Sequence, residues 1–308
     1  MKVLVTGGAG FIGSHITDLL IEKGHKVVVV DNLSTGKKEN VNKKAVFYKQ
    51  DICDKKGLEN IFEKEKPKAI IHQAAQANVR KSIEDPVCDM NVNVGGSINL
   101  FECAKKFNVK KIVYSSSGGA IYGDPEYLPA DEKHPIKPLC PYGAAKYTVE
   151  KYLDYYCTVH GIKAVSLRYS NVYGPRQDPL GEAGVVAIFS KKFLTGETPN
   201  IFGDGLQTRD FVFVKDVARA NVIALEKDVK FSAINIGSGV ETSVNELTEM
   251  LRKASGSKAK PKHVKPVPGE VRRTFLKVSL AKKELGWAPK TKLQDGLKET
   301  VEWVKSRK

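Results

Sequence analysis

Short apolar runs alternate with helix-compatible segments through the first half of the chain. Runs rich in β-branched residues, as in buried strands, lie at 2–6, 26–30, 46–48, 69–72, 111–114 and 163–169. Segments with helical spacing of apolar residues lie between them, at 14–23, 56–65, 86–107 and 142–160. Strands that alternate with helices form parallel sheets covered on both faces. The sequence therefore predicts an α/β fold with a doubly wound parallel sheet.

The alternation lapses after residue 170, which indicates a second, smaller lobe. Further elements are predicted at helix 185–194, strand 211–214, helix 216–225 and strand 233–236, and the last three look like a return to the first sheet. Helical patterns at 244–254 and after 293 flank a basic, proline-rich loop. We predict one unit of residues 1–172 with about 208–236, and a smaller α/β lobe of about 173–207 and 237–308.

A glycine-rich turn joins the first strand to the first helix. It reads Gly7-Gly-Ala-Gly10-Phe-Ile-Gly13, and Asp31 ends the second strand 18 residues later. Such glycines let the backbone approach a pyrophosphate at the helix N-terminus, and the acid takes the adenosine ribose hydroxyls. The pattern predicts a Rossmann site for NAD. Asp31 would repel the 2′-phosphate of NADP, whereas the nearby Lys37 and Lys38 act against that preference.

Other polar or small residues follow further strands, at the sheet edge where ligands of such folds gather. Asp51 and Ile52 could bracket an adenine, and Gln73-Ala74-Ala75 would let the backbone lie against a cofactor. The run Ser115 to Ser117 ends the fifth strand, and Ser170 to Arg176 follows the sixth. A serine run also occurs in turns that bind nothing.

Tyr142 and Lys146 stand four residues apart, one turn from each other on a single helix face. An ammonium beside a phenol favours the phenolate and lowers the tyrosine pKa. A tyrosine with a lowered pKa can serve as a general base or acid. The same spacing occurs by chance on many surface helices, so the pair gains meaning only from the cofactor and substrate residues around it.

Composition narrows the class of protein. The 308 residues are 41% hydrophobic and 28% charged, as in soluble globular proteins. There is no apolar run of membrane-spanning length, and the first residues lead directly into the glycine cluster rather than forming a secretory leader. The five cysteines lack a paired spacing, which argues against a disulfide framework and a metal site. We expect a cytoplasmic protein.

The net charge of +15 raises the question of an anionic partner. The lysines are spread along the chain in short groups, without the interleaved aromatic residues of a nucleic-acid surface. We therefore expect no dedicated nucleic-acid partner. A lysine-rich surface, of the kind that thermophilic proteins carry, would also attract a phosphorylated substrate.

The chain resembles a known family over nearly its whole length. The motifs are Thr6 to His15, Asp31-Asn-Leu33, Asp51-Ile52, His72 to Ala75, Asn93 with Gly96, Ser115 to Gly123, Pro141 to Lys146, Arg168 to Arg176, Arg209-Asp210 and Leu285-Gly-Trp287. They are similar to those of extended short-chain dehydrogenases/reductases, specifically the nucleotide-sugar epimerases of the UDP-glucose (UDP-galactose) 4-epimerase type.

The resemblance implies an NAD-dependent 4-epimerase of UDP-hexoses that works through a transient 4-keto sugar. Tyr142 would be the base, Lys146 would hold the nicotinamide ribose, and Ser117 would bond to the sugar's 4-oxygen. It implies cofactor contacts from Gly7, Gly10, Phe11, Ile12, Gly13, Asp31, Asn32, Ser34, Thr35, Gly36, Asp51, Ile52, Gln73, Ala74, Ala75, Asn93, Ser115, Tyr142, Lys146 and Tyr169. It implies substrate contacts from Ser117, Tyr142, Asn171, Arg209, Glu270 and Thr274, and a homodimer formed by the helices around 86–107 and 142–160.

The chain departs from the family pattern at three places. Val267 stands where many relatives have an arginine that clamps the diphosphate, and Lys265 or Arg272 could substitute. Ser170 replaces a common aromatic residue before Asn171. Thr274 stands where some relatives narrow the sugar pocket with a tyrosine, which leaves room for N-acetylated sugars.

Related activities on the same fold are alternatives. A dehydratase or decarboxylase needs an acid just after the serine, where this chain has Gly118-Gly119. A UDP-glucuronate 4-epimerase needs no such acid and stays open. A non-catalytic NAD-binding protein is a remote alternative, since such proteins usually lose the tyrosine or lysine that this chain keeps.

Overall fold

The computed structural model describes residues 1–179, 184–229, 231–266 and 271–307. Within them, seven parallel strands form one sheet in the order β10-β6-β5-β4-β1-β2-β3. Their bounds are β1 (Lys2–Thr6), β2 (Lys26–Asp31), β3 (Val46–Lys49), β4 (Ala69–His72), β5 (Lys111–Ser117), β6 (Lys163–Tyr169) and β10 (Ser232–Ile236). The strand order reverses between β1 and β4, where doubly wound sheets bind ligands. The predicted fold class is confirmed.

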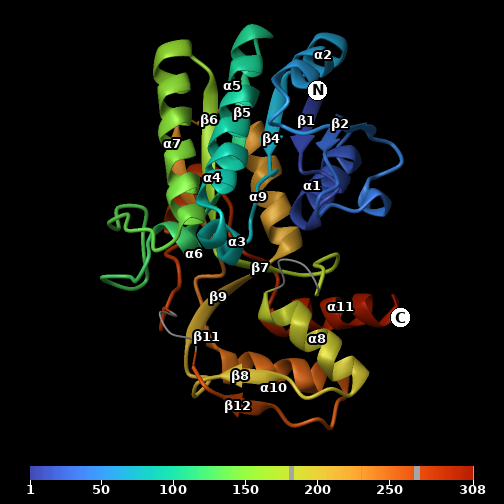
Figure 1. Ribbon diagram of the computed structural model, residues 1–308, viewed down its shortest axis with the longest axis vertical. Helices are drawn as coiled ribbons and strands as arrows, with labels where there is room; N and C mark the ends of the chain where they lie inside the picture. The colour runs from blue at the N-terminus through green and yellow to red at the C-terminus, as the bar shows by residue number, and fades with distance from the viewer. Residues whose placement is uncertain (180–183, 230, 267–270, 308) are drawn as a thin grey trace.

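Helices cover both faces of this sheet (Figure 1). One face carries α1 (Phe11–Glu22) and α9 (Val214–Glu226), and the other carries α2 (Lys55–Glu65), α5 (Gly96–Lys106) and α7 (Pro141–His160). Apolar residues of neighbouring strand positions alternate between the two cores: Val3 and Val5 face α1, while Leu4 faces α2 and α5. Buried parallel strands are apolar on both faces, which explains their continuous apolar runs.

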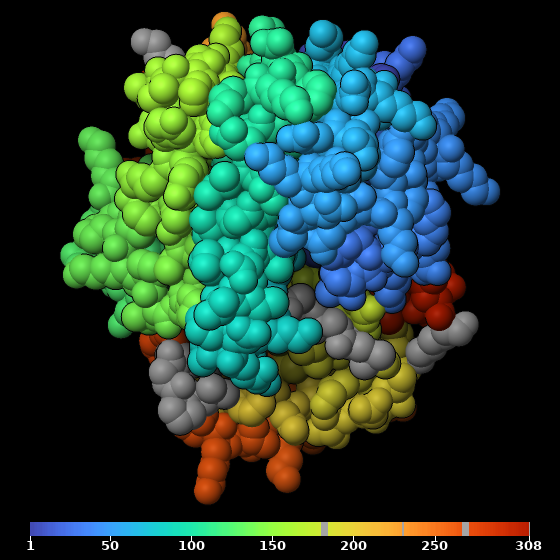
Figure 2. All heavy atoms as spheres, turned by 45° about the horizontal axis from the view of Figure 1, so that its top comes forward, coloured from blue at the N-terminus to red at the C-terminus, as the bar shows by residue number. Residues whose placement is uncertain are grey.

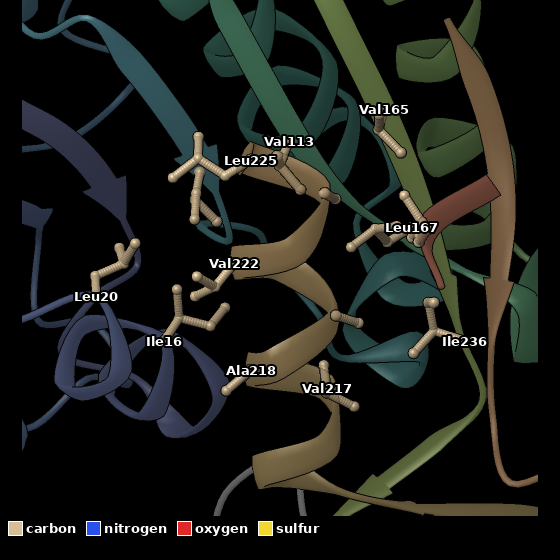
Figure 3. Close-up of a cluster of buried hydrophobic side chains, with 14 of the residues drawn as sticks. Ile16, Leu20, Val113, Val165, Leu167, Val217, Ala218, Val222, Leu225 and Ile236 are labelled. Atoms are coloured by element: carbon tan, nitrogen blue, oxygen red, sulfur yellow. The ribbon is translucent and has the colours of Figure 1, made fainter. Parts of the chain in front are cut away.

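The core between α9, α1 and the sheet is built from residues at helical spacing (Figure 3). Ala218, Val222 and Leu225 of α9 recur at intervals of four and three, so they share one face of that helix. Figure 3 shows this face between the side chains of α1, such as Ile16, and strand residues such as Val113. This packing holds α1, and with it the glycine turn, against the sheet.

The smaller lobe contains two further sheets within the described residues. One consists of β7 (Asn171–Tyr173), β9 (Thr208–Phe213) and β11 (Glu241–Ser243), and the other of β8 (Asn200–Phe202) and β12 (Lys262–Val264). The lobe also holds α8 (Val185–Thr195), α10 (Val244–Ser255) and α11 (Leu293–Lys305). The expectation that strand 211–214 returns to the first sheet is wrong, because β9 pairs with β7 and β11. Of the three elements that look like a return to the first sheet, only α9 packs on it and only β10 joins it.

Two other elements differ from their predictions. The single helix expected at 86–107 is α4 (Pro86–Met90), a π-helical turn at Asn91–Gly95, and α5, preceded by α3 (Val79–Glu84). Strand β5 continues beyond residue 114 to Ser117, because its last residues pair in register with those of β6. The short helix α6 (Gly118–Ile121) follows at once, then an irregular stretch up to α7. In the described part of the chain, we find no helix long and apolar enough to cross a membrane.

Candidate active site

The glycine turn between β1 and α1 is closed on one side and open on the other. Gly7 has a φ of +67°, and a Cβ there would lie 2.7 Å from the backbone nitrogen of Ala74. A Cβ on Gly13 would lie 2.2 Å from the Gly7 carbonyl oxygen. Gly10, the N-cap of α1, would meet only the Gly7 oxygen at 3.2 Å, and no side chain caps the helix. Free N–H groups beside open space fit a pyrophosphate.

Asp31 lies at the carboxyl end of β2, beside this turn. Its Oδ2 accepts from the Ala9 N–H at 3.0 Å and its Oδ1 from the Leu33 N–H at 2.8 Å. Burial raises the pKa of its carboxyl, while the two N–H groups oppose the rise. Each carboxylate oxygen can accept a further bond, so two ribose hydroxyls can be held. Of the predicted cofactor contacts at 34–36, Gly36 lies against this carboxylate, since a Cβ on it would be 2.8 Å from Oδ1.

The predicted adenine residues also lie beside this strand end. Asn32 donates from Nδ2 to Asp51 Oδ2 at 2.8 Å, and Asp51 Oδ1 accepts from the Cys53 N–H. Ile52 is buried in the core against Gly96, whose Cβ would lie 2.7 Å from Ile52 Cδ1. The residues of the glycine turn, Asp31 and this adenine side together fit the adenosine diphosphate part of a dinucleotide.

A buried hydrogen-bond chain fixes the segment after β4, which the sequence predicted to lie along the cofactor. The Ala74 N–H donates to Thr6 Oγ1, which lies 2.7 Å from His72 Nδ1, and His72 Nε2 lies 2.8 Å from Ser97 Oγ. Ser97 donates to the carbonyl oxygen of Asn93. A carbonyl only accepts, so the His72 proton is on Nε2 and Thr6 donates to Nδ1. Burial and the charge of Lys146 lower the His72 pKa to about 3, consistent with a neutral ring.

Asn93 lies in the π-helical turn and secures the same segment with its side chain. Its Oδ1 accepts from the Gln76 N–H, and its Nδ2 donates to the Gln76 carbonyl and to Asp89 Oδ1 at 2.9 Å. Asp89 is fully buried, and Gln76 Nε2 also donates to its Oδ1. Asn93 therefore positions the backbone of the segment after β4, and its contact with a cofactor stays a prediction. π-Helical turns frequently occur at such sites.

Gln73 and Tyr169 meet beneath the ends of β4 and β6. Gln73 Nε2 donates to the Tyr169 hydroxyl at 3.2 Å, and Asn221 of α9 bonds to that hydroxyl at 2.7 Å. Burial raises the Tyr169 pKa to about 12. Tyr169 is thus a neutral phenol that joins the ends of these strands, and it is paired in register with Ser117 of the neighbouring strand β5.

Tyr142 and Lys146 lie in the first two turns of α7. The Lys146 Nζ is 5.7 Å from the centroid of the Tyr142 ring and donates to the Ser115 carbonyl oxygen at 2.7 Å. Lys146 is 3% exposed, and burial lowers its pKa to about 8, while the charges of Asp89 and Glu150 oppose the drop. An ammonium fixed beside a phenol is what a phenolate base requires.

Ser117 is the last residue of β5 and the N-cap of the short helix α6. A Cβ on Gly143 would lie 2.5 Å from the Ala120 carbonyl oxygen, so α7 begins directly against α6. Beyond Ser117, Gly118 has no room for a side chain, because its Cβ would lie 2.7 Å from Leu276 Cδ1. Gly119 faces the predicted substrate residue Asn171, whose Oδ1 would lie 3.9 Å from such a Cβ.

A buried ion pair secures α7 one turn after Lys146. Glu150 accepts from Arg168 Nε at 3.0 Å and from Arg168 Nη2 at 2.7 Å, and Ser166 also donates to it. Arg168 Nη1 donates to the Tyr122 hydroxyl at 2.9 Å. Sequence reasoning missed Glu150, although its position four residues after Lys146 on the same helix was a usable signal.

The remaining described substrate residues come from β9 and from the segment that runs parallel beside it. The Arg209 Nη1 donates to the Thr208 carbonyl at 2.7 Å, and the Thr274 N–H donates to the same carbonyl at 3.2 Å. This brings the two predicted residues together. Arg272, a predicted substitute for the missing arginine, makes a bidentate ion pair with Asp204 at 2.7 Å. Glu270 and Val267 lie outside the described residues.

The chain matches a known protein family over most of its length. The model of the family described as "NAD dependent epimerase/dehydratase family" matches residues 3–237. A relative from Mycolicibacterium smegmatis, named UDP-glucose 4-epimerase, is 44% identical over 100% of this chain and 99% of its own length.

Solved structures agree in fold over the whole chain. The crystal structure of UDP-glucose 4-epimerase with UDP-glucose from Thermotoga maritima has a TM-score of 0.97 at 49% identity, covering 100% of this chain and 99% of that one. The UDP-glucose 4-epimerase of Thermus thermophilus, in complex with NAD, has a TM-score of 0.93 at 44% identity and covers 99% of both chains.

Proposed function

Because the chain belongs to the NAD dependent epimerase/dehydratase family, we propose that it is an NAD-dependent 4-epimerase that interconverts UDP-glucose and UDP-galactose. The observation that carries the proposal is the Tyr142–Lys146 pair, anchored to Ser115 beside a turn that fits a dinucleotide. The names of the similar proteins support UDP-glucose as a substrate.

The glycine turn and Asp31 would hold NAD, which would supply a reversible hydride acceptor for C4 of the sugar, so that a transient 4-keto sugar can be reduced on its other face. Tyr142 moves the proton: its phenolate accepts the proton of the 4-hydroxyl and gives it back once the sugar has turned. Lys146 keeps a positive charge beside that phenolate, and its ammonium has further N–H groups for a ribose hydroxyl. Ser117 donates a hydrogen bond to the same 4-oxygen, which holds it in reach of Tyr142.

The environment of Ser117 favours epimerisation over elimination. A dehydratase needs an acid just after this serine, but Gly118 is blocked by Leu276 and Gly119 carries no side chain. With nothing there to remove water, the keto sugar can only be reduced again. UDP-glucuronate 4-epimerisation needs no further acid and is the second candidate.

The half-buried Thr274 supports a wider range of sugars. A threonine leaves more room than the tyrosine that narrows the pocket in some relatives. We therefore propose that the N-acetylhexosamine forms are substrates as well, held by Asn171 and Arg209 at the diphosphate. Residues 1–170 with 214–236 would hold NAD and present Ser117 and Tyr142 to the sugar. The smaller lobe, with Asn171 of β7 and Arg209 of β9, would hold the rest of the nucleotide sugar.

We also propose that the protein is a homodimer. Apolar side chains that are 39–62% exposed gather on the helices of one face, at Val79, Ile83, Val87, Met90, Tyr152, Tyr155 and Val159. Figure 2 shows residues 79–106 (teal) beside the yellow-green α7 on that face. Exposed apolar residues on adjacent helices fit a bundle with a second copy. A cytoplasmic location is supported by the five cysteines, which are all free thiols.

The test is incubation of the purified protein with a panel of UDP-sugars, without added NAD, followed by separation of the products. We expect UDP-glucose and UDP-galactose to reach the same equilibrium mixture from either side. UDP-N-acetylglucosamine and UDP-glucuronate in the panel separate the sugar alternatives. Release of water or carbon dioxide, or no change in any sugar by protein that carries NAD, would contradict the proposal.

A further inference from the structure

Lys37 lies at the edge of the adenosine side of the dinucleotide site. Its backbone N–H donates to the Ala9 carbonyl at 3.0 Å, and the preceding Gly36 packs against the Asp31 carboxylate. A lysine beside the acid that takes the ribose hydroxyls would attract a 2′-phosphate, since an ammonium binds phosphate as a point charge. Asp31 and Lys37 thus have opposite effects on the choice between NAD and NADP.

The structure pairs this lysine with a residue from a distant part of the chain. Lys37 Nζ lies 2.7 Å from Asp178 Oδ2. The neighbouring Lys38 is engaged elsewhere, with its Nζ 3.3 Å from the centroid of the Phe47 ring. Both lysines, which would oppose the preference for NAD, therefore contact other residues of the same chain.

The segment that carries Asp178 is fastened to α1. His15 Nε2 donates to the Pro175 carbonyl at 2.9 Å, and Arg176 Nη1 lies 2.7 Å from Asp18 Oδ2. Burial lowers the His15 pKa to about 4, so the ring is neutral near pH 7 and its proton is on Nε2. Arg176 has a φ of +69°, a backbone conformation that is unusual outside glycine. The position of Asp178 opposite Lys37 is thus set by α1, the helix of the glycine turn.

We propose that Asp178 is a specificity-determining residue for the cofactor. It holds the Lys37 ammonium and cancels its charge, so that Asp31 repels a 2′-phosphate without opposition. An exposed ion pair of this kind adds little to the stability of the fold. Its main effect is therefore to lower the positive charge near the adenosine end of the cofactor. The proposal rests on the NAD site of the proposed function and does not depend on the sugar chemistry.

The experiment measures which nucleotide the holoenzyme binds. Wild type, Asp178→Asn and the double variant Lys37→Met/Asp178→Asn are incubated with equal concentrations of labelled NAD and NADP until the label in the protein is constant. The bound nucleotides are then released and separated by chromatography. Asp228→Asn, which breaks the exposed pair of Lys163 and Asp228, is the matched control.

We expect the ratio of bound NADP to bound NAD to rise about three- to fivefold in Asp178→Asn, as for one exposed charge interaction. The ratio should return to the wild-type value in the double variant and stay at that value in the control. An unchanged ratio in Asp178→Asn overturns the proposal, and so does a rise that persists without Lys37. Because no sugar is present, a protein that binds NAD but fails as an epimerase would refute the proposed function alone.

Discussion

The Lys146 ammonium is tied to the backbone of β5 through the Ser115 carbonyl at 2.7 Å, while its charge lies 5.7 Å from the Tyr142 ring centroid. Both residues belong to α7, but the lysine side chain is also fixed by its hydrogen bond to β5. Because α7 starts directly against α6, the end of the same strand, where Ser117 lies, is close to the start of the helix that carries this pair. The position of the proposed proton-transfer group therefore depends on how α7 packs against β5.

Replacing Tyr142 by phenylalanine removes the hydroxyl that carries the proton. We expect kcat to fall by about 10²–10⁴-fold, the usual contribution of a general acid–base group. The bound NAD content should stay at the wild-type level, because the glycine turn and Asp31 are unchanged. Steady-state kinetics and the absorbance of released nucleotide measure the two quantities.

Tyr147→Phe, on the same helix, is the control and should keep its kcat, because the Tyr147 ring lies beside Lys151 rather than Lys146. Undiminished turnover by Tyr142→Phe would refute the proposed mechanism.

The activity should fall as the pH rises above about 8. Burial lowers the Lys146 pKa to about 8, so the ammonium that supports the phenolate is present below that pH and is lost above it. A profile of kcat/KM from pH 6 to 10 measures this alkaline limb. Replacing Asp89 by asparagine removes a negative charge that opposes the drop, so the limb should move to lower pH.

Asparagine can still accept the bonds from Gln76 and Asn93, which makes Asp89→Asn a conservative change. A limb that stays in place in this variant would show that Asp89 does not act on Lys146. A limb that moves upward would contradict the sign of the interaction.

Replacing Arg168 by methionine should lower the free energy of unfolding by about 3–5 kcal/mol, because it leaves the Glu150 carboxylate buried without its cation. Urea denaturation followed by circular dichroism measures the loss. Arg273→Met breaks the exposed pair with Glu241 and should cost less than about 1 kcal/mol. Equal losses in the two variants would mean that burial of the first pair is unimportant.

A tyrosine in place of Thr274 should restrict the sugars that are accepted. The larger side chain fills space next to Arg209, so turnover of UDP-N-acetylglucosamine should fall at least about tenfold relative to UDP-glucose, as a steric clash in a pocket implies. Thr274→Ser keeps the volume small and should accept both sugars. If Thr274→Tyr does not change the sugar preference, the N-acetyl group does not bind next to residue 274.

The dimer can be tested by placing charges on the exposed apolar face. Val87→Lys and Tyr155→Lys put ammonium groups where an interface would bury them, so the protein should sediment as a monomer. Analytical ultracentrifugation of wild type and variants measures the mass. Val240→Lys, an exposed apolar position in the smaller lobe, should leave the wild-type mass unchanged. If the wild-type protein sediments as a monomer, the proposal of a homodimer is wrong.

The sequence predicted the parts of the molecule that local patterns specify. Apolar runs such as 69–72 and 163–169 became strands with the predicted bounds, because parallel strands buried on both faces are apolar throughout. The glycine turn and the Tyr142–Lys146 spacing likewise depend on neighbouring residues, and both appear as predicted in geometry. The sequence spacing was sufficient for these features.

Features that depend on distant residues were missed. The contacts of Lys37 with Asp178 and of His15 with Pro175 join segments more than 100 residues apart, and no periodicity connects them. The placement of β9 in the smaller lobe depends on its pairing with β7, which follows β6 directly in the chain. Such pairings are decided by tertiary packing, which overrides the local pattern.

Asp210 shows what this means for recombination between relatives. Its buried carboxylate accepts from Ser170, from the backbone and hydroxyl of Ser238, and from the N–H groups of Gly239 and Leu276. These donors come from both sides of the boundary between the two units. A chimera that exchanges residues 237–308 for those of another epimerase must therefore bring donors that meet this carboxylate, or it will leave a buried charge unsatisfied.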